Sequence, residues 1–124
     1  MGNYTVCPAR EELRRANKQF SVELKGEYTT HRFIRNSTSV TFQSLQSHRD
    51  DNSNQFENWP YQPQEPPSYI SLKAMPVEIN LWLFHGEPPR NGRQVELSVR
   101  SFGFTPAPPA GRRRTSRQAD STPR

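Results

Sequence analysis

The sequence has a single cysteine and no long hydrophobic run. Cys7 has no second cysteine with which to form an internal disulfide, a redox pair or a thiolate metal site. No apolar stretch approaches the roughly 18 residues of a membrane span, and residues 1–6 lack the apolar core of a secretory signal. These absences predict no membrane partner, and they leave the cellular compartment undetermined.

Apolar residues are scarce throughout the chain. Hydrophobic types make up 31% of the 124 residues, and the 6 glycines raise this to about 36%, below the roughly 45–50% of an average soluble domain. The 12 prolines disfavour long helices, because proline lacks the backbone N–H and clashes with the preceding turn. The composition therefore predicts at most one small domain with a small core, and it argues against a helical bundle.

Positive charge is concentrated at the C-terminal end. Residues 105–124 hold five basic and one acidic side chains of a chain whose net charge is +5. This end has no large apolar residue to compensate the entropy of ordering and no aromatic residue to stack on bases. We therefore expect a disordered basic tail over residues 106–124. Nucleic acid bound through Arg112, Arg113 and Arg114 is an alternative, which binding that survives about 0.2 M salt would favour.

The alternation of apolar and polar residues predicts an all-β body of about five antiparallel strands. Residues 10–17 have too few apolar positions for more than a fraying turn. Strands are expected over 20–24, 28–35 and 39–44, the last two joined as a hairpin by the turn residues 36–38. Residues 77–84 alternate most regularly, residues 85–92 read as a turn, and residues 95–99 alternate again before a bulge near Ser101. Residues 46–68 are expected to form a long loop.

Five strands in one curved sheet leave an apolar face that needs covering, which favours either a small barrel or part of a larger sandwich. Four stretches together resemble the C-terminal half of a glycoside hydrolase family 16 domain: His31-Arg-Phe-Ile, Ser39-Val-Thr-Phe-Gln-Ser, Pro76-Val-Glu-Ile-Asn-Leu-Trp-Leu-Phe-His-Gly and Val95-Glu-Leu-Ser-Val-Arg-Ser-Phe-Gly-Phe. The resemblance covers residues 17–105. It implies an antiparallel concanavalin A-like jelly-roll sandwich, present here in part, with residues 1–16 as an N-terminal extension.

The resemblance also implies what the chain lacks for catalysis. The family's retaining glycosidases cleave β-glucans and galactans, with their catalytic carboxylates on one strand as Glu-x-Asp-x-Glu or Glu-x-Asp-x-x-Glu. Alternate residues share a face, so the outer carboxyl groups can lie about 5–5.5 Å apart, as retention requires. The nearest approach in this sequence is Glu23, Lys25 and Glu27, which has a cation at its centre. We therefore predict no catalytic residues and read these as surface charges, with the family's catalytic strand upstream of the matched region.

The resemblance places two sugar-binding residues on the strand expected over 77–84. Asn80 matches an amide that hydrogen-bonds hydroxyl groups, and Trp82 matches an indole that stacks on a pyranose ring; the alternative is that Trp82 fills the core. Trp59 and Tyr61 would form a cleft wall or cap the sheet edge. The three histidines are dispersed without metal-ligand spacing, and His31 is expected to be structural. No metal and no cofactor are predicted.

Three functions follow from these observations. The first is an inactive or glycan-binding portion of a family 16-like domain, whose partner is a polysaccharide or oligosaccharide. The second is a non-catalytic carbohydrate-binding or structural β module that is complete by itself, which cooperative unfolding of the monomer would favour. The third is the nucleic-acid binder described above.

Overall fold

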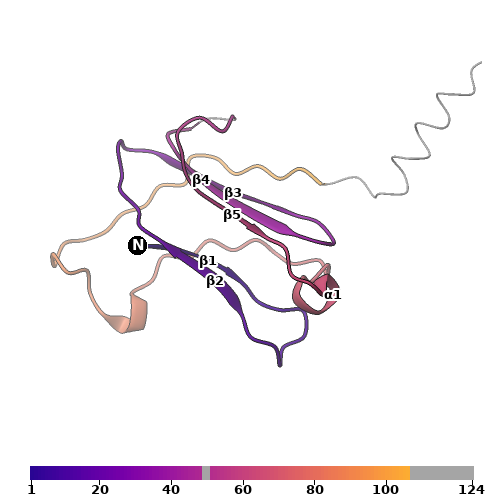
Figure 1. The fold of residues 1–124 in the computed structure, drawn as a ribbon. Coiled ribbons are helices and arrows are strands. Elements are labelled where there is room, and N and C mark those ends of the chain that lie inside the picture. Colours follow the sequence, from indigo (N-terminus) through magenta and orange to yellow (C-terminus); the bar gives the residue numbers. More distant parts are fainter. Residues whose placement is uncertain (49–50, 107–124) are drawn as a thin grey trace, which may run out of the picture. The chain divides into compact units, whose positions relative to one another are not determined.

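The chain forms an all-β, antiparallel fold, as the sequence predicts. The structure is a computed structural model that describes residues 1–48 and 51–106, so the predicted tail lies outside the described residues except for Pro106. The chain divides into two units, Met1–Ala74 and Met75–Arg124. Figure 1 shows the strands of the first unit, in indigo to magenta.

The first unit contains two antiparallel sheets. In one, β1 (Gly2–Val6) pairs with β2 (Ala16–Phe20). In the other, β3 (Thr29–Arg35), β4 (Val40–Gln46) and β5 (Gln55–Tyr61) lie in that order. A single helical turn, α1 (Pro66–Tyr69), follows β5. The Arg10 N–H donates to the carbonyl of Ser68 in this turn at 3.0 Å, and Arg35 Nη1 donates to the carbonyl of Ser71, just after the turn, at 2.8 Å.

The predicted hairpin is confirmed as β3 and β4. Both strands are rich in β-branched and aromatic residues, which suit a pleated surface. Their turn is held by Asn36, whose Oδ1 accepts hydrogen bonds from the backbone N–H groups of Thr38 and Ser39, both at 2.9 Å. Asparagine favours turns because its side chain can replace a backbone acceptor in this way.

The expectation of a loop over residues 46–68 is wrong, because this stretch contains β5 and α1. Pro60 lies within β5 opposite Thr41. Proline cannot donate to a sheet ladder, and it is tolerated here because β5 is an edge strand with one unpaired side. The β4–β5 register shifts between Ser44 and Leu45, so the irregularity of the sheet lies there; Ser101, where the bulge was expected, is in no strand.

The N-terminal residues belong to the fold rather than preceding it. The strand expected over 20–24 instead runs over 16–20 as β2, because β1, which the alternation pattern does not predict, supplies its partner. The boundary expected at residue 16 therefore coincides with no division of the structure. Gly2 leaves room for the Phe20 ring, since a Cβ at position 2 would lie 2.4 Å from that ring.

Aromatic rings pack between the two sheets of this unit. The Tyr4 ring of β1 lies 4.8 Å from the Phe42 ring of β4, and Phe42 lies 5.6 Å from Trp59 of β5. Tyr4 also shares a 2.5 Å hydrogen bond with Ser44, whose side chain is fully buried. The buried apolar residues among those described are Tyr4, Val40, Leu45 and Ile70. The small core predicted from the composition is thus assembled within the first unit.

The second unit does not contain the two strands predicted for it. Residues 77–83 and 95–99 alternate as expected, but no described residue pairs with them in a sheet. Their alternate apolar side chains, Val77, Ile79, Leu81, Leu83, Val95, Leu97 and Val99, are 54–61% exposed. Alternation predicts which face of a strand would be buried. A strand also needs a neighbouring strand with which its backbone can form hydrogen bonds. In this part of the chain the described helical element is a single 3₁₀ turn, η1 (Phe84–Gly86).

Candidate functional site

Two turns shape the chain between residues 81 and 95 in the second unit. At the first, η1, His85 and Gly86 have φ of 55° and 75°, and the Gly86 N–H donates to the Leu83 carbonyl at 3.0 Å. At the second, the Gly92 N–H donates to the Pro89 carbonyl at 2.9 Å, and Gly92 has φ of 64°. Glycine adopts such left-handed conformations without steric cost. The sequence predicts a single turn over residues 85–92, and the structure has one turn at each end of this stretch.

These turns enclose an open hollow of about 800 Å³, called here the Trp82 hollow. Its volume lies within the range of about 300–1,000 Å³ that is usual for ligand sites. Large apolar side chains and several polar ones line it together: Leu81, Trp82, Leu83, Phe84, His85, Glu87, Pro88, Pro89, Arg90, Arg93, Gln94 and Val95. A surface of this mixed kind suits a ligand that has both an apolar face and hydroxyl groups.

Trp82 is 77% exposed, so its indole does not fill the core of this structure. Phe84 is also largely exposed, at 74%. Its ring contacts that of His85 edge to face, with centroids 4.1 Å apart. The exposed rings of Trp82 and Phe84 are therefore available to stack on a flat apolar partner.

Asn80 lies two residues before Trp82 in the extended segment, and it too is exposed. It is not among the residues that line the Trp82 hollow. Asn80 therefore directly precedes the hollow in sequence, and the wall of the hollow begins at Leu81.

Trp59 and Tyr61 lie on strand β5, where the sequence analysis expected a loop. Both are half-buried, and their rings contact each other with centroids 5.3 Å apart. Trp59 also stacks parallel to Tyr4 at 6.5 Å. The pKa of Tyr61 is raised by burial, and by the nearby Tyr69. These contacts give both residues a packing role in the first unit, which corresponds to the sheet-capping alternative.

The expected structural role of His31 agrees with its surroundings in β3. Its Nδ1 lies 2.8 Å from Ser44 Oγ, and its Nε2 lies 3.0 Å from Thr29 Oγ1. His31 is exposed on part of its surface, and the burial of the rest of its ring lowers its pKa, because that part of the charged imidazolium loses contact with water. Residues 1–48 and 51–106 contain no group of three or more His, Cys, Asp or Glu side chains placed to hold a metal ion.

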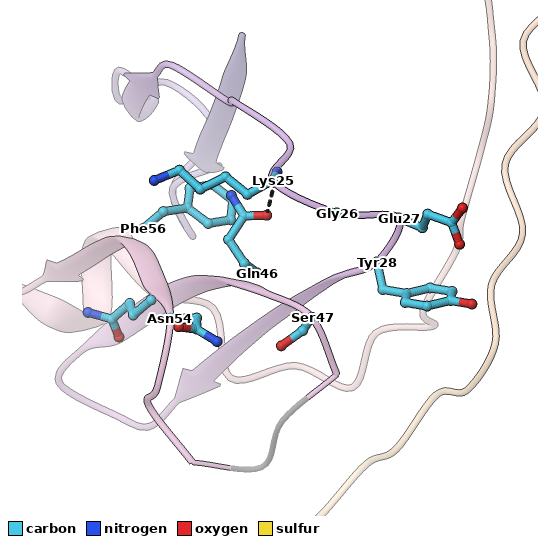
Figure 2. Close-up of a pocket in the computed structure, with 9 residues that line it drawn as sticks. Lys25, Gly26, Glu27, Tyr28, Gln46, Ser47, Asn54 and Phe56 are labelled. Carbon is cyan, nitrogen blue, oxygen red and sulfur yellow. Dashed lines mark hydrogen bonds between the residues drawn. The ribbon is translucent and has the colours of Figure 1, made fainter.

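A second hollow, in the first unit, was not found by sequence reasoning. It has a volume of about 410 Å³ and is called here the Ser47 hollow. Its lining residues come from the segment before β3, the end of β4 and the start of β5: Lys25, Gly26, Glu27, Tyr28, Gln46, Ser47, Asn54, Gln55 and Phe56 (Figure 2). The one feature of the sequence that points to this hollow is the polar run over residues 46–55. This run does not by itself predict a hollow, because the wall also needs the strand that follows it, β5.

Glu23, Lys25 and Glu27 are the nearest approach of the sequence to the family's catalytic triplet. Glu23, Lys25 and Glu27 are all exposed, in a segment that is not a strand. Their side chains therefore do not share one face of a sheet, and they remain surface charges.

Comparison of the chain with protein-family models, with curated proteins and with solved structures finds no match. In the described part of the chain, no helix is both long and apolar enough to cross a bilayer.

Proposed function

We propose that the chain is a glycan-binding β module similar to part of a glycoside hydrolase family 16 domain, and that it binds a β-linked glucan or galactan without cleaving it. Trp82 would supply the stacking platform and Asn80 a hydrogen-bonding amide. The observation that carries the proposal is the 77% exposure of Trp82 at the edge of an 800 Å³ hollow.

The chemistry around Trp82 supports a sugar as the ligand. The axial C–H groups of a pyranose form an apolar face that packs on an indole, while its hydroxyl groups need donors and acceptors around the ring edge. The hollow supplies these from His85, Arg90, Arg93 and Gln94. An exposed aromatic patch that is rimmed by polar groups is typical of a binding site.

The same hollow supports binding rather than hydrolysis. Retaining glycosidases need two carboxyl groups about 5–5.5 Å apart, one as nucleophile and one as general acid. Among the described residues that line the Trp82 hollow, Glu87 is the single carboxylate. A sugar bound there would lack the second group, so we expect no turnover.

Isothermal titration calorimetry of the full chain with a soluble β-glucan and a soluble galactan tests the proposal. The substitution Trp82→Ala should weaken binding about tenfold or more, because it removes about 1.4 kcal/mol or more of apolar burial. Trp82→Phe should retain part of the affinity, because a smaller ring still covers the sugar face.

Phe104→Ala is the matched control. Phe104 is also 77% exposed, but it does not line the hollow, so its removal should leave the affinity unchanged. Equal binding heats for the wild type and Trp82→Ala would exclude Trp82 from the site. Release of reducing ends from either polysaccharide would contradict the absence of turnover.

A structural β module is the second candidate, and one observation favours it. The first unit pairs its five strands into two sheets and holds the buried apolar residues Tyr4, Val40, Leu45 and Ile70, as a module that is complete by itself would. If this is the function, neither polysaccharide binds, and the monomer still unfolds cooperatively.

A further inference from the structure

The Ser47 hollow has walls that are held in place by one side chain of β4. Gln46 Oε1 accepts a hydrogen bond from the Lys25 backbone N–H at 3.3 Å, and its Nε2 donates to the Glu23 carbonyl at 2.7 Å. These two bonds attach the segment before β3 to the end of β4, and Figure 2 shows the one between Lys25 and Gln46. The opposite wall is the start of β5, where Phe56 is half-buried. The hollow is thus supported by strands on one side and by a clamped loop on the other.

Two polar side chains in this hollow have hydrogen-bonding capacity to spare. Ser47 Oγ is buried and has no hydrogen-bond partner among the described residues. A buried hydroxyl without a partner is costly, and native structures rarely leave one without a role. The Asn54 side chain also forms no hydrogen bond with the described residues, although its backbone carbonyl accepts from the Gln46 N–H at 2.9 Å. In Figure 2 the side chains of Ser47 and Asn54 extend towards each other, below Gln46.

The backbone at these two positions is strained in the same sense. Ser47 has φ of 66° and Asn54 has φ of 60°, the left-handed region that non-glycine residues seldom adopt. Asparagine tolerates this region better than serine does. Strain of this kind persists where the surrounding structure imposes it, and it is concentrated at ligand sites. The conformation holds both polar side chains at the hollow.

The charged side chains that line the hollow extend away from its uncharged polar groups (Figure 2). In Figure 2 the Lys25 ammonium and the Glu27 carboxylate lie towards opposite sides, away from the Ser47 hydroxyl and the Asn54 amide. Of the uncharged side chains that line the hollow, those of Gln46 and Gln55 hydrogen-bond within the protein, and the Tyr28 ring contacts His48. The Ser47 hydroxyl and the Asn54 amide form no such bonds with the described residues, and Phe56 adds a ring whose other contacts are with Phe20 and His31. This set matches a neutral ring that carries hydroxyl groups and has an apolar face, rather than a phosphate or a carboxylate.

We propose that the Ser47 hollow is a second binding site, which takes a single neutral sugar or cyclic polyol. Ser47 and Asn54 hydrogen-bond its hydroxyl groups, and Phe56 contacts its carbon face. Because Ser47 Oγ forms no hydrogen bond with the described residues, rotating it towards a ligand breaks none of them. None of these residues lines the Trp82 hollow, so the inference goes beyond the function proposed above and does not depend on it.

The test is a titration of the ¹⁵N-labelled full chain with methyl β-glucoside and with myo-inositol, followed by two-dimensional NMR. We expect saturable shifts of the Ser47 and Phe56 amides and of the Asn54 side-chain amide for at least one of the two probes. Ser47→Gly and Asn54→Gly each remove one polar side chain and suit a positive φ, so both should fold. Each should weaken binding about fivefold, the effect of one neutral hydrogen bond.

Ser37→Gly is the control, because it makes the same change at an exposed serine that does not line the hollow. It should bind as the wild type does. The proposal is overturned if neither probe shifts these signals, if Ser47→Gly and Asn54→Gly both bind as tightly as the wild type, or if methyl phosphate binds there more tightly than both probes. Repeating the titration with Trp82→Ala separates the two sites: shifts at Ser47 that persist show that this hollow binds independently of Trp82.

Discussion

Ser44 connects three strands of the first unit through its hydroxyl. It lies on β4, and it hydrogen-bonds Tyr4 of β1 and His31 of β3. Ser44 is fully buried, so the hydroxyl needs these partners to offset the loss of water. Burial raises the pKa of the Tyr4 phenol above its ordinary value, because the charged phenolate would be poorly solvated there. A polar contact thus joins the two sheets within their aromatic packing.

His31 makes the stability of the fold depend on pH. Burial lowers its pKa below the ordinary value of 6.5, so in the window between the two values the unfolded chain binds more protons than the folded chain. The contribution of His31 is therefore complete above about pH 6.5 and decreases as the pH falls through that window. We expect the free energy of unfolding to be lower at about pH 5.5 than at about pH 7.5, the two sides of the ordinary histidine value.

Urea unfolding of the wild type and of His31→Gln at the two pH values measures this effect. Glutamine keeps polar atoms near Ser44 and does not titrate, so the variant should show a smaller difference between the two pH values. His48→Gln is the control for the loss of a histidine. An equal pH dependence in the wild type and His31→Gln would contradict the assignment.

At the level of residues, the sequence predicted roles where the local pattern carries the information. The structural role of His31 follows from its place in a strand of β-branched and aromatic neighbours. The Ser47 hollow could not be predicted, because Ser47, Asn54 and Phe56 come together only once β4 and β5 pair.

The β3–β4 hairpin is the element that depends most on its own sequence. Asn36 Oδ1 accepts hydrogen bonds from two backbone N–H groups of the turn, those of Thr38 and Ser39, and from both of their hydroxyls. This acceptor holds the turn between two strands that pair along their whole length.

Asn36→Ala should lower the free energy of unfolding by about 1 kcal/mol, because it removes the shared acceptor of the turn. Asn36→Asp is the matched control, since a carboxylate oxygen can accept the same bonds. Urea unfolding gives the energies, and amide hydrogen exchange at Thr38 and Ser39 should become faster only in the alanine variant. If the two variants unfold alike, the side-chain acceptor is not what holds the turn.

Residues 77–84 show that the alternation of apolar and polar residues does not by itself predict a strand. They are the most regular alternation in the sequence, and they form no strand. β5 is the opposite case, a strand whose proline and polar residues hide its pattern but whose neighbour β4 supplies the pairing. Alternation predicts a preference, and a partner strand determines whether that preference is expressed.

For the molecule as a whole, the buried apolar residues are confined to one unit. Tyr4, Val40, Leu45 and Ile70 all lie within Met1–Ala74, whereas the large apolar side chains of residues 75–106 are more than half exposed. The stability measured in solution should therefore come from the first unit.

A fragment of residues 1–74 should unfold cooperatively in urea, with the midpoint and slope of the full chain. The slope reflects the surface exposed on unfolding, and most of that surface is buried in the first unit. Circular dichroism measures both quantities, with the full chain as the reference. Loss of the cooperative transition in the fragment would show that residues beyond 74 contribute to folding.

The sequence by itself determined the all-β class, the β3–β4 hairpin with its Asn36 turn, and the scarcity of core. Each of these depends on local propensity or on composition. Only the tertiary structure decided that residues 2–6 and 55–61 are strands, that Trp59 packs in the first unit while Trp82 is exposed, and where the two hollows lie. Strand pairing and cavities arise from contacts between residues far apart in the chain, and a local pattern does not specify which segments meet.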